Sequence, residues 1–112
     1  MGKPTALVFI NRAESSDPAL DLRHALAVAD ELRLHVLRCY VTGPMRPSAF
    51  RDLMEDARAQ HVAMVLIPRV EPESPERLDA IRRVCTVLAV DTGYAYPQYG
   101  LALASAVSAR RA

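Results

Sequence analysis

Tryptophan is absent from this chain of 112 residues, and long apolar runs, cysteine and an excess of charge of either sign are missing or scarce. No apolar run approaches the roughly 20 residues that a membrane-spanning helix needs. Fourteen basic and thirteen acidic residues leave a net charge of +1, which argues against a domain that binds DNA by bulk charge. The length has room for one core, so we expect a single domain over residues 1–112.

Potential ligands for metals and phosphates are also few. Cys39 and Cys85 lie inside apolar segments, away from metal-ligand spacing, and the three histidines are scattered. We therefore expect two buried free thiols, no zinc site and no other cofactor. No Gly-rich loop follows the first apolar segment, which argues against a nucleotide site. The first residues do not resemble a secretory leader, so the expected location is the cytoplasm.

Short apolar segments alternate with helical patterns along the chain. Strands are expected over residues 6–10, 34–41, 62–67 and 84–90. Asp17-Pro18 predicts a helix start, because aspartate caps helix N-termini and proline favours the first helical position. The apolar stripe predicted for this helix consists of Leu22, Ala25, Leu26, Ala29 and Leu32. Asp21 lies off that stripe, so we expect it at the surface.

This alternation predicts an α/β domain with a doubly wound open sheet. We expect four parallel strands in the order 2-1-3-4, with helices on both faces and the most apolar segment, 62–67, at the centre. A tyrosine-bearing loop should follow the fourth strand. An alanine-rich helix is expected from about 100 to 111.

In such a sheet the ligand crevice lies at the carboxyl ends of the strands, where the winding reverses. The side chains that should gather there are Arg12, Glu14, Ser15, Arg46, Arg69 and Glu71. The arginines could bind an anion, because guanidinium forks match phosphate oxygens. In the other interpretation, Arg12 forms a solvated ion pair with Glu14 or Glu71.

The C-terminal part of the chain is rich in contact-forming side chains. Tyr94, Tyr96 and Tyr99 could stack on a ligand or partner, or pack the last helix onto the sheet. The apolar residues of that helix include Leu101, Leu103 and Val107, on more than one of its faces. We therefore expect a homodimer with these six residues at the interface. The alternative is a helix that folds back onto its own sheet in a monomer.

The order of the segments resembles the catalytic domain of the serine recombinases, the resolvase and invertase family. That family opens with an apolar strand and an aromatic-x-Arg-x-Ser pattern. Residues 8–15 (Val-Phe-Ile-Asn-Arg-Ala-Glu-Ser) occupy that place, so Arg12 matches the family arginine. The family then has an Arg-Pro pair after the second strand and an Asp-Thr pair before a dimerisation helix; Arg46-Pro47 and Asp91-Thr92 match them. The resemblance covers nearly the whole chain.

The positions that carry the family's chemistry differ in this sequence. The family's nucleophilic serine aligns with Glu14, and Ser15 lies one position further along. Two family arginines after the third strand are absent from residues 71–75 (Glu-Pro-Glu-Ser-Pro). Losing one charge-stabilising donor typically costs about a hundredfold in rate. A glutamate at 4 Å would repel a phosphodiester by about 4 kcal/mol at an effective dielectric near 20. The resemblance therefore implies a domain that is degenerate at the active site.

Three functions are open at this point. The first is a pseudoenzyme that acts through protein contacts in DNA recombination or its regulation, without direct DNA binding, since no helix-turn-helix module follows. The second is a flavodoxin-like module that binds a small molecule or anion through Arg12, Arg46 and Arg69. The third is an active DNA strand-transfer enzyme with Ser15 as nucleophile, assisted by Arg12 and Arg46.

Overall fold

Strands and helices alternate along the chain in the computed structural model of the protein, which describes residues 2–43, 48–70 and 75–100. The elements are β1 (Thr5–Asn11), α1 (Pro18–Glu31), β2 (His35–Thr42), α2 (Ala49–Ala59), β3 (Met64–Ile67), α3 (Pro75–Arg82), β4 (Thr86–Ala89) and β5 (Tyr94–Tyr96). Among these residues, no helix is both long and apolar enough to span a bilayer. The predicted sites that lie outside the described residues are Arg46, Glu71, Leu101, Leu103 and Val107, with nearly all of the expected terminal helix.

The five strands form one sheet in the order β2-β1-β3-β4-β5. The pairs β1–β2, β1–β3 and β3–β4 are all parallel, so the winding reverses between β1 and β3. The predicted order 2-1-3-4 is confirmed, with β3 at the centre. The open doubly wound α/β class is confirmed as well.

The sheet also has a strand that the sequence does not predict. Tyr94–Tyr96, expected to be a loop, pairs antiparallel with β4 and forms an edge of the sheet. A tight turn returns the chain: Gly93 has a φ of +73°, and its N–H donates to the Ala89 carbonyl at 2.8 Å. Three residues are too short for a recognisable alternation of apolar and polar side chains, although tyrosine favours strands.

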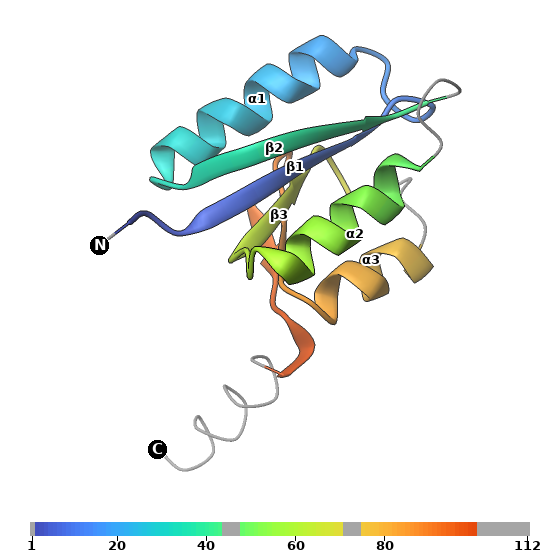
Figure 1. Cartoon of the computed structure of the whole chain (residues 1–112). Helices are drawn as coiled ribbons and strands as arrows, with labels where there is room; N and C mark the ends of the chain where they lie inside the picture. Colours follow the sequence, from blue (N-terminus) through green and yellow to red (C-terminus); the bar gives the residue numbers. More distant parts are fainter. Residues whose placement is uncertain (1, 44–47, 71–74, 101–112) are drawn as a thin grey trace.

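Helices cover both faces of the sheet, with α1 on one side and α2 and α3 on the other (Figure 1). Successive strand residues point to opposite faces. In β1, Ala6, Val8 and Ile10 therefore join the core under α1, and Leu7 and Phe9 join the core under α2 and α3. None of these five side chains is more than 1% exposed. This burial on both faces explains the continuous apolar run of β1.

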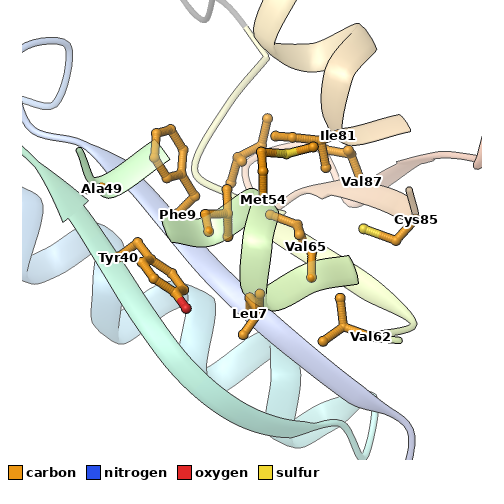
Figure 2. Packing of buried hydrophobic residues seen from close by; sticks show 13 residues of the cluster. Leu7, Phe9, Tyr40, Ala49, Met54, Val62, Val65, Ile81, Cys85 and Val87 are labelled. Atoms are coloured by element: carbon orange, nitrogen blue, oxygen red, sulfur yellow. The ribbon is translucent and has the colours of Figure 1, made fainter. Parts of the chain in front are cut away.

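Figure 2 shows the larger core, between the sheet and the helices α2 and α3. Phe9 packs edge-on against Phe50, with ring centroids 5.5 Å apart, and Met54 and Ile81 are part of the same cluster. The thiol of Cys85 is buried here, and its burial raises the pKa of that thiol to about 11. As expected, both cysteines are free, although the other one is only half-buried.

The helix α1 begins as the sequence predicts. The side chain of Asp17 accepts a hydrogen bond from the backbone N–H of Leu20 at 3.1 Å, and a proline opens the helix. The predicted apolar stripe is partly wrong, because Leu26 and Leu32 are 40% and 50% exposed. The small side chains of Ala25 and Ala29 make the buried contacts with the sheet.

Candidate functional site

The chain turns sharply where β1 ends. The backbone N–H groups of Glu14 and Ser15 both donate to the carbonyl of Asn11 at 3.0 Å, and the Asn11 side chain accepts from the N–H of Ala13 at 3.2 Å. This turn leaves Arg12 and Glu14 exposed and Ser15 half-buried. Ser15 therefore lies beside the start of α1, where its hydroxyl contacts Asp21.

Ser15, Asp21 and Arg69 form a polar cluster between α1 and the loop after β3. The Oγ of Ser15 donates to Oδ2 of Asp21 at 2.5 Å. The guanidinium of Arg69 donates to both carboxylate oxygens of Asp21, with Nη2 3.2 Å from Oδ1 and Nη1 3.4 Å from Oδ2. Asp21 is only 8% exposed, whereas the Arg69 side chain is 37% exposed. The carboxylate is thus satisfied from two sides by groups far apart in sequence.

The ion pair predicted for Arg12 with either Glu14 or Glu71 does not form with Glu14: within residues 2–43, 48–70 and 75–100, no ion pair joins the two. Arg12 instead lies beside the end of β2, where its N–H donates to the Thr42 carbonyl at 3.2 Å. The side chains of Arg12 and Glu14 are both exposed. Water therefore solvates each charge, and an ion pair between them would gain little free energy. The alternative acid, Glu71, lies outside the described residues, so an Arg12–Glu71 pair stays a prediction.

Asp21 is the residue that sequence reasoning missed. A helical aspartate off the apolar stripe is expected at the surface, yet Asp21 is buried by contacts with Ser15 and Arg69. The separation of 48 residues between Asp21 and Arg69 carries no local signal. The available clue is topological, because the loop after β3 and the start of α1 both lie at the carboxyl ends of the strands.

Two pockets flank Arg69 at the carboxyl ends of β3 and β4. The larger has a volume of about 430 Å³ and lies against α1, with Val28 and Val90 among its apolar lining residues. The smaller has a volume of about 300 Å³ and extends to Tyr96. Arg69 and Asp91 line both pockets. The carboxyl ends of β3 and β4 therefore bring together an arginine held by Asp21 with acidic and apolar side chains.

The tyrosines of the C-terminal part form a second candidate site, at the β5 edge. Tyr94 and Tyr96 pack edge-on with ring centroids 4.6 Å apart. The guanidinium carbon of Arg82 lies 4.2 Å from the centroid of the Tyr99 ring, and the Tyr99 hydroxyl donates to Asp79. That hydrogen bond raises the pKa of Tyr99. Tyr94 is 58% exposed and Tyr99 is 39% exposed, so their rings are oriented but uncovered.

A further polar cluster, at the β2 edge of the sheet, joins β2 to α2. The hydroxyl of Tyr40 donates to Asp56, and Arg38 forms an ion pair with the same carboxylate at 3.5 Å. Burial, together with the hydrogen bond to Asp56, raises the pKa of Tyr40 to about 12. The Arg38 side chain is 69% exposed, which marks this pair as a weak surface contact.

The arrangement of strands and helices matches a solved structure. A resolvase family site-specific recombinase from Streptococcus pneumoniae superposes with a TM-score of 0.68, over 97% of this chain and 88% of that chain. The fold is resolvase-like. The identity of 14% limits the likeness of this resolvase-like domain to its fold. No protein-family model matches the chain, and no curated protein matches it.

Proposed function

We propose that this resolvase-like domain is catalytically degenerate and acts as a homodimer, through protein contacts, in DNA recombination or its regulation. The observation that carries the proposal is the hydrogen bonding of the Ser15 hydroxyl. Its hydroxyl is bound to the Asp21 carboxylate, which is itself held by Arg69. The two free thiols fit the reducing cytoplasm that we propose as its location.

The electrostatics around Ser15 oppose attack on a phosphodiester. A phosphate placed at the Oγ of Ser15 would come close to the Asp21 carboxylate, which lies 2.5 Å from that oxygen. Arg69, which contacts the same carboxylate, is already neutralised by it. At an effective dielectric near 20, two like charges 4 Å apart repel each other by about 4 kcal/mol. This repulsion acts against the charge-stabilised transition state that phosphoryl transfer needs.

The β5 edge offers the protein-contact surface. Tyr94 and Tyr99 are exposed. An edge-on contact with Tyr96 orients the Tyr94 ring, and a cation–π contact with Arg82 orients the Tyr99 ring. Tyrosines with restricted rings bind partners at a low cost in conformational entropy, and they are enriched among interface residues that dominate affinity. The short β5 strand also leaves one backbone edge without a strand partner in the described sheet.

The same hydrogen bond also fits the alternative function, an active strand-transfer enzyme. A carboxylate that accepts the hydroxyl proton of a serine can act as a general base for that serine, and Asp21 is placed in this way beside Ser15. This alternative requires a covalent bond between Ser15 and DNA. The two functions therefore differ in a product that can be isolated.

The test of the proposed dimer is the solution mass of the full chain over a wide concentration range. We expect a dimer whose dissociation constant rises about tenfold or more in the variant Tyr94→Ala, as is usual for a central interface tyrosine. Leu26→Ala is the matched control, because it removes an exposed apolar side chain from α1, away from β5. A monomer at high micromolar concentration, or equal dissociation constants for the two variants, would contradict the proposal.

A further inference from the structure

The pocket of about 430 Å³ between α1 and the ends of β3 and β4 is large enough for a small ligand. Its wall carries two kinds of group. Ala27 and Val28 of α1 and Val90 after β4 supply apolar surface, and Arg69 and Asp91 supply charge. None of these five residues belongs to the tyrosine surface at β5, so ligand binding in this pocket is independent of the proposed dimer.

Arg69 is a fixed donor with capacity to spare. A guanidinium has five N–H donors. Arg69 uses two of them, one on Nη1 and one on Nη2, to donate to Asp21. In the part of the chain that the structure describes, Arg69 makes no further hydrogen bond. The edge formed by Nε and the adjacent Nη can therefore donate two parallel hydrogen bonds to a second carboxylate. Because Asp21 holds the guanidinium in place, little conformational freedom is lost when that carboxylate binds.

Asp91 is a fixed acceptor at the same pocket. Its Oδ1 accepts from the backbone N–H of Thr92 at 2.8 Å, which orients the carboxylate and leaves Oδ2 for another donor. The backbone N–H of Asp91 donates to the carbonyl of Pro68 at 3.0 Å, so Asp91 lies directly beside the residue that precedes Arg69. A guanidinium and a carboxylate with unused hydrogen-bonding capacity thus face one pocket from neighbouring strand ends.

The charge balance selects the class of ligand. The pocket is lined by the two acids Asp21 and Asp91 and by Arg69 as its arginine, with His24 also present. A simple anion gains little, since Asp21 already compensates Arg69 and Asp91 repels it. A simple cation would leave the donors of Arg69 unused. We propose that the pocket binds an aliphatic α-amino acid, whose carboxylate pairs with Arg69, whose ammonium pairs with Asp91, and whose side chain packs against Val28 and Val90.

The test is a titration of the ¹⁵N-labelled chain with L-leucine, followed by amide chemical shifts. We expect saturable shifts at Val28, Val90 and Asp91 at millimolar leucine. Leucine amide lacks the carboxylate, and 4-methylpentanoate lacks the ammonium. Each should bind about tenfold more weakly or worse, because each loses one charge-assisted contact.

The variant Asp91→Asn should weaken leucine binding by a similar factor, whereas Asp30→Asn, an exposed acid elsewhere on α1, should leave it unchanged. Both positions are exposed, so neither change threatens the fold. Unchanged binding in Asp91→Asn, equal binding of 4-methylpentanoate and leucine, or no shifts at the pocket would each overturn the proposal. The solution mass that tests the dimer is a separate readout, so the two proposals can fail independently.

Discussion

Replacing Arg69 with alanine is expected to destabilise the domain by about 2 kcal/mol. The change removes both hydrogen bonds from the guanidinium to Asp21 and leaves that carboxylate, 8% exposed, without its opposite charge. Breaking a fully buried ion pair costs about 3–5 kcal/mol, and the value is lower here because the Arg69 side chain is 37% exposed. Urea unfolding at neutral pH measures the change in the free energy of unfolding.

Arg38→Ala is the matched control for this effect. Arg38 also pairs with one aspartate, but its side chain is 69% exposed and its partner is 36% exposed. The loss of such a surface pair costs about 0.5 kcal/mol or less. Asp21→Asn removes the buried negative charge that Arg69 compensates. In the Asp21→Asn background, Arg69→Ala should therefore lower the free energy of unfolding much less than it does in the natural chain. Equal costs for Arg69→Ala and Arg38→Ala would show that the buried pair does not stabilise the fold.

Phe9→Ala should have the largest effect on stability, a loss of about 3–5 kcal/mol. Phe9 lies at 0% exposure on β1, and its edge-on contact with Phe50 joins the sheet to α2. Removing the ring leaves a cavity in the core shown in Figure 2, where the strand and two helices restrict collapse. A domain of this size has only about 5–15 kcal/mol of total stability, so the urea midpoint should fall steeply.

The control for the core substitution is Leu37→Ala on β2, whose side chain is 39% exposed. It should cost less than about 1 kcal/mol, because little apolar area returns to water. Similar costs at both positions would contradict the assignment of Phe9 to a tightly packed core.

The sheet could be predicted from the sequence because its inner strands, β1, β3 and β4, are buried on both faces. Residues 6–10 of β1 and all of β3 are apolar without a break, which marks central parallel strands. The order 2-1-3-4 then follows from right-handed crossovers and a reversal of winding. The strand Tyr94–Tyr96 could not be predicted, since its pairing depends on the turn at Gly93 and not on a pattern of its own.

The candidate site was predictable in position but not in its contacts. Strand order places the loops after β1 and β3 side by side at the carboxyl ends of the strands, so the sequence predicts that Ser15 and Arg69 lie near each other. Which acid meets Arg69 depends on helix rotation and side-chain packing, and these brought Asp21 inward while Glu14 stayed exposed. Ion-pair choice among several exposed acids is decided by small energy differences, for which the sequence has no local signal.

The proposed function rests on Ser15, whose hydroxyl is bound to the Asp21 carboxylate and which, we propose, does not attack DNA. The direct measurement is to incubate the full chain with a pool of DNA duplexes of varied sequence and to search for protein bound covalently to DNA after denaturation. The variant Ser15→Ala is run in parallel. We expect no covalent product from either protein. A covalent adduct formed by the natural chain and lost in Ser15→Ala would contradict the proposed function, and would identify the protein as a strand-transfer enzyme.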